Sequence, residues 1–316
     1  GDAVEFWIET SGNDLFGVSQ EKDPALDDPN RFGRHECKVR KMRLGVFDEN
    51  LWHLWLDFEV LLGIAQTSPE KSVRRLRAVR CLNEAINAFK DDPQNVHASR
   101  EILMPELSKQ ASASDLNVCA VGHAHIDTAW LWPVSETVRK CARTFASQVK
   151  LLEEYPDYVF GASQPQHYVF VKETYPELYK KIKKLVQQGR WEPQGGMWVE
   201  ADCNLINGES MVRQFVHGKN FFMDEFGVDV KNLWLPDVFG YAASMPQILR
   251  NSGIEFFLTQ KLSWNQTNEL PHHTFKWRGI DGSEVITHFP PENNYNSMLN
   301  PQVVVPGRDR FKEKSF

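Results

Sequence analysis

Residues 118–132 place several side chains that can bind a metal within a few positions of one another. They read Val-Cys-Ala-Val-Gly-His-Ala-His-Ile-Asp-Thr-Ala-Trp-Leu-Trp, so a small and apolar run leads into His123, His125 and Asp127. The run 118–121 predicts a short buried strand that ends at these polar residues. Alternate residues of an extended chain point to one side, so His125 and Asp127 can face one cation if the strand continues that far. Imidazole and carboxylate together suit zinc and its neighbours in the first transition row.

Two simpler explanations compete with a metal site in this stretch. A His-x-Asp triplet arises by chance in most chains of this length, and a histidine at a strand end often only hydrogen-bonds a backbone carbonyl. The aromatic residues that follow, Trp130 and Trp132, favour the functional interpretation. The apolar face of a sugar ring packs on an indole, so metal ligands beside tryptophans suit a carbohydrate.

A second carboxylate follows another predicted strand. The apolar run 232–235 stops at Pro236, and Asp237 comes directly after it. An aspartate in such a loop most often caps the next helix. That helix is predicted to begin only near Ser244, which is itself a good cap, so Asp237 is a candidate site residue.

A third polar group lies in the loop 195–204, again after a predicted strand. Glu200, Asp202, an amide at Asn204 and the ring of Trp198 can all face the same site. Glu200 and Asp202 equally fit solvated turn residues. We include Asp202 among the neighbours of the predicted site.

The elements that must position these residues alternate along the chain after residue 115. The predicted strands are 117–122, 158–162, 190–193, 232–235, 256–260 and 285–288. The predicted helices are 135–155, 166–175, 176–189, 208–226 and 244–252. This order is typical of βα units around a parallel sheet, either barrel-like or open, in an α/β fold. In both architectures the chemistry gathers at the carboxyl ends of the strands.

The upstream part of the chain has a different pattern. Residues 49–110 predict packed helices, with the second helix starting at Pro69. Their broad apolar face comprises Leu51, Trp52, Leu54, Trp55, Phe58, Leu61 and Leu62. Residues 3–10 alternate as a strand does, and we expect them to close an upstream β domain that a polar linker, 22–32, connects to the helices.

Composition limits the classes of partner. The chain has 316 residues, 41% of them hydrophobic, which is enough for a large core in about two domains. A net charge of -6 argues against nucleic acid as a partner, because phosphate binding needs a basic surface. No apolar run approaches the roughly 20 residues that span a bilayer, so we expect no membrane partner. Five widely spaced cysteines without a Cys-x-x-Cys pair favour a reducing compartment.

Four motifs together resemble one known family. They are Gly122-His-Ala-His-Ile-Asp-Thr-Ala-Trp130, Trp234-Leu-Pro-Asp-Val-Phe-Gly-Tyr241, Thr259-Gln-Lys-Leu-Ser-Trp-Asn265 and Pro271-His-His-Thr-Phe-Lys-Trp277. They closely resemble the class II α-mannosidases of glycoside hydrolase family 38, nearest to the cytosolic and vacuolar branch. The resemblance extends from about residue 115 to the end of the sequence, and the two first motifs are highly specific as a pair.

The resemblance implies a role for each matching residue. His125, Asp127 and Asp237 would bind one divalent metal, Zn²⁺ or Co²⁺, and Asp237 would also be the catalytic nucleophile. Trp130 would stack beneath the mannose ring, and His123 would orient a ligand. The metal would bind the neighbouring 2- and 3-hydroxyls of mannose and hold the ring in a distorted shape. Substrates would be mannose-containing oligosaccharides.

The resemblance also implies what the matched stretch omits. The fourth metal ligand, a histidine, and the acid/base aspartate lie beyond it, so we expect 115–316 to be an α/β glycosidase catalytic domain that is truncated at its C-terminal end. It would follow a helical segment, 31–114, and the end of an upstream β domain with its linker, 1–30. We expect a homo-oligomer in the cytoplasm or in the vacuole or lysosome; no N-terminal signal is visible in the sequence.

The sequence is also compatible with two other functions. The His-x-His pair at a strand end also suits an amidohydrolase-like metal hydrolase, which would cleave amides and leave aryl α-mannosides intact. A truncated, non-catalytic glycan-binding fragment would bind mannose without turnover.

Overall fold

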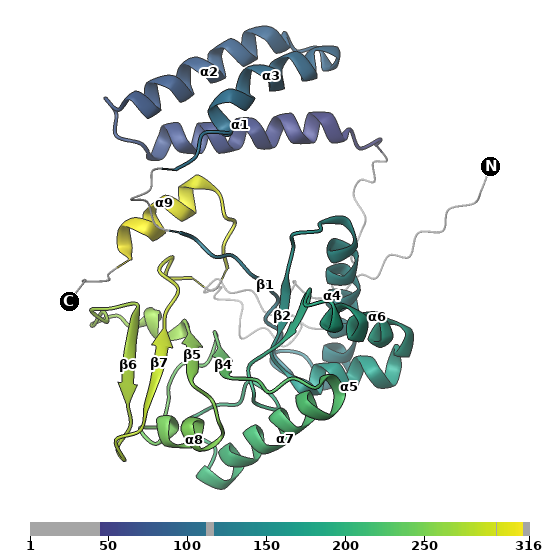
Figure 1. The fold of residues 1–316 in the computed structure, drawn as a ribbon, viewed down its shortest axis with the longest axis vertical. Coiled ribbons are helices and arrows are strands. Elements are labelled where there is room, and N and C mark those ends of the chain that lie inside the picture. Colours follow the sequence, from purple (N-terminus) through teal and green to yellow (C-terminus); the bar gives the residue numbers. More distant parts are fainter. Residues whose placement is uncertain (1–44, 112–116, 295, 312–316) are drawn as a thin grey trace, which may run out of the picture.

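The computed structural model describes residues 45–111, 117–294 and 296–311 (Figure 1). The predicted strand 3–10 and the linker 22–32 lie outside the described residues. Helices α1–α3 form one layer of the molecule, and an α/β part follows them along the chain (Figure 1). Helix α9 (Pro301–Arg310) lies between the two, where Gln302 Nε2 donates to Gln66 Oε1 over 3.1 Å.

The helical segment predicted upstream is present as α1 (Glu49–Thr67), α2 (Val73–Phe89) and α3 (Val96–Leu107), with a short 3₁₀ turn, η2 (Pro93–Asn95), before α3. The prediction that Pro69 starts the second helix is wrong. The Ser72 N–H closes a turn on the Pro69 carbonyl, and the Ser72 hydroxyl then caps α2 by accepting from the Arg75 N–H.

The predicted apolar face of α1 is only partly buried. Leu54 and Leu61 lie in a core that α2 and α3 complete, together with Leu82, Ala85, Val96 and Leu103. Trp52 and Trp55 stack on each other with ring centroids 4.8 Å apart and stay about half exposed. Part of the face that the sequence pattern predicted as core is therefore surface in the described structure.

The first sheet is built from three short parallel strands. They are β1 (Gly122–His123), β2 (Phe160–Ala162) and β3 (Trp191–Pro193). Helix α4 (Val134–Glu154) connects the first two strands, and α5 (Pro165–Thr174) and α6 (Pro176–Gln187) connect the second and third. The core under this sheet is aromatic, with Phe145, Phe160, Tyr168, Trp191 and Phe222 all buried.

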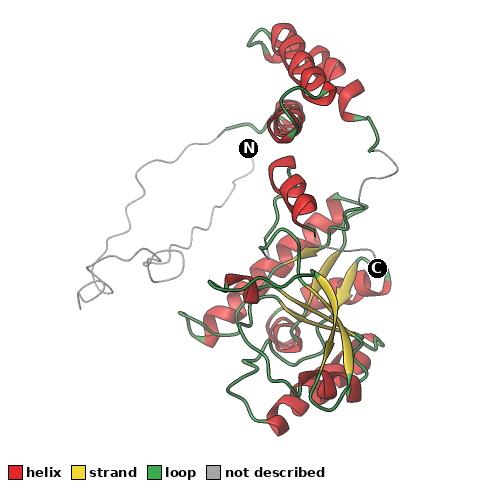
Figure 2. Cartoon of the chain, turned by 90° about the vertical axis from the view of Figure 1, so that its left-hand side faces the viewer, coloured by secondary structure: helices red, strands yellow, loops and turns green. Residues whose placement is uncertain are grey.

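The second sheet has the order β4-β5-β7-β6. Its strands β4 (Asn232–Leu235), β5 (Phe256–Thr259) and β7 (Glu284–His288) run parallel, and β6 (Thr274–Arg278) pairs antiparallel with β7. Helix α7 (Gly208–Phe226) precedes β4, α8 (Met245–Asn251) follows it, and the 3₁₀ turn η3 (Lys261–Trp264) follows β5. In a view turned by 90°, helices lie on both sides of the strands (Figure 2).

The first strand is later and shorter than the predicted 117–122. Val118 and Val121 are about half exposed and lie outside the strand, which contains only Gly122 and His123. Gly122 pairs with Phe160, the first residue of β2, so the backbone before Gly122 has no neighbouring strand among the described residues. The apolar run predicted a strand here, but the extent of β1 is set by the residues that pair with β2.

The architecture is open and not barrel-like within the described residues. Each sheet ends at strands that pair on one side only, β1 and β3 in the first, β4 and β6 in the second. Between β3 and β4 the chain turns through Gly195 and Gly196, at φ 92° and 72°, which only glycine adopts readily. At this turn the Gly195 N–H donates to the Asn232 side chain at 3.4 Å, but no strand ladder joins β3 to β4 among the described residues.

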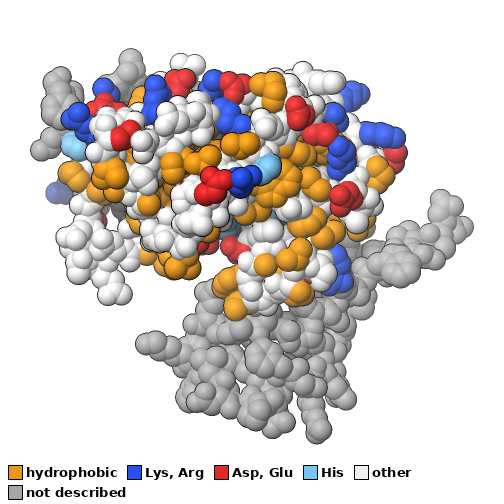
Figure 3. Space-filling view, turned by 90° about the horizontal axis from the view of Figure 1, so that it is seen from below, with side chains coloured by type: hydrophobic (Ala, Val, Ile, Leu, Met, Phe, Trp, Pro, Cys, Tyr) orange, Lys and Arg blue, Asp and Glu red, His pale blue; other side chains and the backbone are white. Residues whose placement is uncertain are grey.

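Acidic, basic and apolar side chains are interspersed across the face drawn in Figure 3. None of the helices in the described part of the chain combines the length and the hydrophobicity that crossing a bilayer requires.

Candidate metal centre and active site

Polar residues follow the carboxyl ends of five parallel strands. In chain order they are His125 and Asp127 after β1, Ser163 and Gln164 after β2, Glu200 after β3, Asp237 after β4, and Lys261 after β5. The carboxyl ends of parallel strands are where α/β folds assemble their sites, because the loops there converge. Contacts among these seven residues join the two sheets at one place.

The three residues predicted as metal ligands lie together. His125 Nε2 is 3.3 Å from Asp127 Oδ1 and 3.5 Å from Asp237 Oδ2. One ligand atom from each of the three residues lies within 4.8 Å of the others. All three side chains are partly buried, so a cation bound between them would be shielded and still reachable.

This donor set fits a zinc-type cation. One imidazole nitrogen and two carboxylate oxygens are the ligands that zinc and its neighbours accept together. Three protein ligands leave coordination positions for a substrate, as catalytic sites require. Within the described residues these three are the only group of histidine, cysteine or acidic side chains close enough to hold an ion.

Carboxylates surround His125 on both edges of its ring. Glu200 Oε2 lies 3.0 Å from Nδ1, on the edge opposite the two acidic groups that face Nε2. Burial lowers the pKa of His125, but Glu200, Asp127 and Asp237 outweigh it and raise the pKa to about 12. A cation that binds Nε2 must displace a proton from that nitrogen, so binding and proton release are coupled.

Asp237 is held by a lysine on its other side. Lys261 Nζ lies 2.6 Å from Asp237 Oδ1, and both side chains are mostly buried. Burial raises the pKa of Asp237, but His125 and Lys261 together hold it below its usual value. Lys261 also packs 3.8 Å from the centroid of the Trp264 ring, and its backbone N–H donates to the Pro236 carbonyl. The carboxylate is therefore ionised at neutral pH and fixed in orientation.

Gln164 hydrogen-bonds both the loop that carries Asp127 and the loop that carries Glu200. Its side chain is buried, and its amide donates to the Ile126 carbonyl at 2.9 Å. Its oxygen accepts from the Thr128 hydroxyl at 2.9 Å and from the Glu200 N–H at 3.1 Å. The residues on either side of Asp127 are thus bonded to the loop that carries Glu200. Sequence reasoning missed Gln164, although a Ser-Gln pair directly after the apolar run 158–162 was a usable signal.

His123 and Trp130, also predicted as site residues, lie outside the group of three metal-ligand candidates. His123 lies within β1, where its Nδ1 is 2.9 Å from the Gly161 carbonyl and its ring is 5.1 Å from that of Trp234. Burial lowers the pKa of His123, so the ring is neutral. Its hydrogen bonds in the described structure do not reach the three clustered ligands. Trp130 lies in the loop after Asp127, about half exposed, with its ring edge-on to Trp132 at 5.4 Å.

Asp202 is a turn residue. Its Oδ1 accepts from the N–H groups of Asn204 and Leu205, both at 2.8 Å, which is the solvated-turn alternative for this position. The acidic residue of this loop that reaches the cluster is Glu200, which the predicted site did not include.

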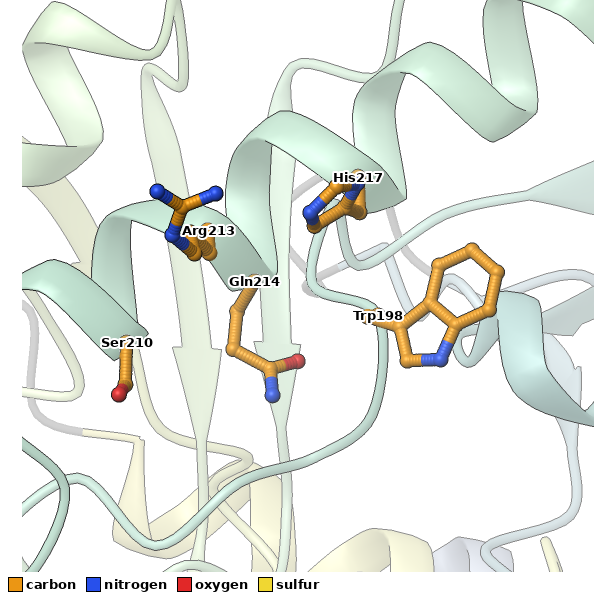
Figure 4. Close-up of a pocket in the computed structure, with 5 residues that line it drawn as sticks. All are labelled: Trp198, Ser210, Arg213, Gln214 and His217. Atoms are coloured by element: carbon orange, nitrogen blue, oxygen red, sulfur yellow. The ribbon is translucent and has the colours of Figure 1, made fainter.

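Helix α7 fixes the loop before Glu200. The Gln214 backbone carbonyl accepts from the Trp198 N–H, and its side-chain oxygen accepts from the Val199 N–H, both at 3.0 Å. Gln214 and Trp198 line a surface hollow beside the helix, with Ser210, Arg213 and His217 (Figure 4). None of these five residues belongs to the metal-ligand cluster, so the hollow is a separate feature.

Comparison with known proteins adds a family to this geometry. The sequence model described as "Glycosyl hydrolases family 38 N-terminal domain" matches residues 115–315. The chain is 42% identical over 294 residues to "Alpha-mannosidase 2C1" of Mus musculus, covering 93% of this chain and 28% of that protein. It is 41% identical over 315 residues to "Alpha-mannosidase G" of Dictyostelium discoideum, covering 99% and 29%.

A third relative extends the range of organisms. The chain is 41% identical over 305 residues to "Alpha-mannosidase" of Saccharomyces cerevisiae, covering 92% of this chain and 28% of that protein. The chain therefore spans less than a third of the length of these three relatives.

Proposed function

Because the chain belongs to glycosyl hydrolase family 38, we propose that it forms the metal-binding part of an enzyme that hydrolyses terminal α-mannosidic bonds with retention of configuration. One observation carries the proposal: His125, Asp127 and Asp237, from loops far apart in the sequence, offer ligand atoms within 4.8 Å of one another. The names of the three relatives support mannose-containing oligosaccharides as the substrates. The compartment we propose is the cytosol or the vacuole or lysosome, and the assembly a homo-oligomer.

The three clustered residues would hold one divalent cation, zinc or cobalt. When bound, the cation supplies a template for the neighbouring 2- and 3-hydroxyls of mannose and stabilises a distorted ring. Trp130, exposed in the loop after Asp127, offers an indole face on which the apolar side of the sugar can stack. These contacts would orient the bound sugar so that one face of its ring lies toward the nucleophile.

Asp237 is the proposed nucleophile. The low pKa of its carboxyl keeps it ionised, and Lys261 holds Oδ1, which leaves Oδ2 on the side of His125. Attack by a carboxylate on the anomeric carbon forms a glycosyl-enzyme ester, which water then hydrolyses. A retaining enzyme needs a second carboxyl group roughly 5 Å away to protonate the leaving oxygen. We assign that role to none of the described residues.

The test uses an aryl α-mannoside whose phenol leaves readily without protonation, so that the nucleophile is tested without the acid. A chelator should abolish release of the phenol, and zinc or cobalt should restore it. Asp237→Ala should lose both the cation and the reaction, whereas Glu192→Ala, exposed on β3, should keep both. Full activity of metal-free protein would refute the metal role. Mannose binding without any turnover would favour a glycan-binding function, and amide cleavage with intact mannosides an amidohydrolase-like one.

A further inference from the structure

Glu200 lies behind His125 as seen from the proposed cation site. Its Oε2 is 3.0 Å from His125 Nδ1, while Nε2 of the same ring faces Asp127 and Asp237. The two nitrogens are on opposite edges of an imidazole, so Glu200 cannot share a cation with Nε2 from this position. It contacts the ligand and not the cation site.

The Glu200 side chain is only 6% exposed. Burying a carboxylate is unfavourable unless hydrogen bonds or opposite charges replace its water. The Ser163 hydroxyl donates to Oε1 at 2.8 Å, and Oε2 faces His125. Oε1 is therefore hydrogen-bonded by the loop after β2, whereas the contact of Oε2 is the close approach to His125 Nδ1, without a well-aligned hydrogen bond in this structure.

The backbone of Glu200 is held as firmly as its side chain. Its N–H donates to Gln164 Oε1, the same oxygen that accepts from the Thr128 hydroxyl beside Asp127. The two preceding residues bond Gln214 on α7, whose side chain points from the helix toward this loop (Figure 4). Glu200 thus has a fixed position relative to the loop that carries His125 and Asp127.

We propose that Glu200 is the positioning residue of the cation site. By accepting a hydrogen bond from the Nδ1–H of His125, it selects the tautomer whose Nε2 lone pair points at the space shared with Asp127 and Asp237. Histidine ligands are commonly oriented in this way by a carboxylate on the other ring nitrogen, and loss of the carboxylate lowers metal affinity. The inference rests on the proposed function, because it assumes that His125 binds a cation.

The experiment measures cobalt(II) binding to the chain by calorimetry and by the visible absorption of the bound ion. Glu200→Ala should weaken binding by about 10- to 100-fold. Glu200→Gln keeps the size of the side chain and an oxygen that accepts from Nδ1–H, so it should recover much of the loss. At saturating cobalt both variants should give the absorption spectrum of the unsubstituted protein, because the ligands are unchanged.

The matched control is Glu192→Ala, which removes an exposed acidic side chain from β3 and should bind cobalt normally. Thermal unfolding of each metal-free variant separates weakened binding from failed folding. Equal affinity of unsubstituted protein and both Glu200 variants would overturn the positioning role and leave the proposed function standing. A changed spectrum at saturation would show that Glu200 is itself a ligand, which also overturns it. Absence of cobalt binding by the unsubstituted protein would sink both the inference and the proposed function.

Discussion

His167 is a buried, uncharged histidine next to the site. Its Nε2 is 3.1 Å from the Thr128 hydroxyl, and because that hydroxyl donates to Gln164, a neutral ring with its proton on Nε2 donates this hydrogen bond. Burial, with smaller effects of His125 and His123, lowers the pKa of His167 to about 3. Protonating it would place a cation among other histidines in a dry interior, which is unfavourable.

This histidine predicts a pH dependence of stability. Between about pH 3 and the unfolded pKa of about 6.5 the unfolded chain binds one more proton than the folded chain, so stability falls as the pH falls through this window. From pH 7 to pH 5 the loss should be about 2 kcal/mol. In urea unfolding at both pH values, the free energy of unfolding of His167→Gln should decrease by about 2 kcal/mol less than that of the unsubstituted protein. His217→Gln, exposed on α7, is the control, and an unchanged loss in His167→Gln would contradict the account.

At the residue scale, the sequence identified the candidate metal ligands but not the residue that contacts the ligand His125 from its other side. His125, Asp127 and Asp237 stand out because each follows a predicted strand and suits a metal. Glu200 and Asp202 lie in one loop and look equivalent in sequence, yet one faces His125 and the other caps a turn. Only the direction of the backbone after Gly195 and Gly196 separates them, and that direction depends on packing against α7.

At the scale of elements, α7 and the loop before Glu200 are in close contact. A Cβ built on Gly218 would lie 2.3 Å from the Gly196 carbonyl oxygen and 2.7 Å from the Met197 carbonyl carbon. Both are backbone atoms, so no side chain can rotate away. The absence of a side chain at Gly218 is what lets the helix approach this loop.

Gly218→Ala should therefore move the helix or the loop. We expect destabilisation of about 1 to 3 kcal/mol, as for other overpacked sites, together with weaker cobalt binding through displaced Glu200. Gly208→Ala is the control in the same helix, since a Cβ there meets nothing within 4 Å and stability should change by no more than about 0.5 kcal/mol. Urea unfolding and cobalt titration measure the two effects. Equal behaviour of the two variants would show that this close contact does not constrain the site.

Helix limits were predictable where the chain carries its own end signals. Asn207 caps the start of α7 and Gly227, at φ 70°, ends it, and the predicted 208–226 is the observed helix. Strand limits depend on partners elsewhere in the chain, which moved β1 to Gly122–His123. The edge strand β6 was missed because its residues are partly exposed and form no buried apolar run.

At the scale of the molecule, the helical layer has a core of its own. Leu61 is fully buried among residues of α1, α2 and α3, whereas Leu233 is fully buried beneath the sheet that carries Asp237. The choice between a barrel and an open sheet could not be made from strand order alone, because closure depends on whether edge strands pair. In the described structure the turn at Gly195 and Gly196 separates β3 from β4.

Separate cores predict separate effects of two matched truncations. Leu61→Ala should destabilise the helical layer by about 2 to 5 kcal/mol, speed amide exchange in α1–α3 and leave cobalt affinity unchanged. Leu233→Ala should speed exchange around β4 and β5 and weaken cobalt binding. Hydrogen exchange measures the local opening in each variant, and cobalt titration measures its affinity for the ion. A loss of cobalt affinity in Leu61→Ala as large as in Leu233→Ala would mean that the two parts act as one unit.

We propose that His125, Asp127 and Asp237 bind a single cation. Crystals of the protein grown with zinc, measured on both sides of the zinc absorption edge, locate that ion directly. We predict one anomalous peak about 2.0 to 2.2 Å from His125 Nε2 and from an oxygen of each aspartate, lost in crystals of Asp237→Ala. Zinc bound elsewhere, or no peak between these three side chains at saturating zinc, would contradict the account.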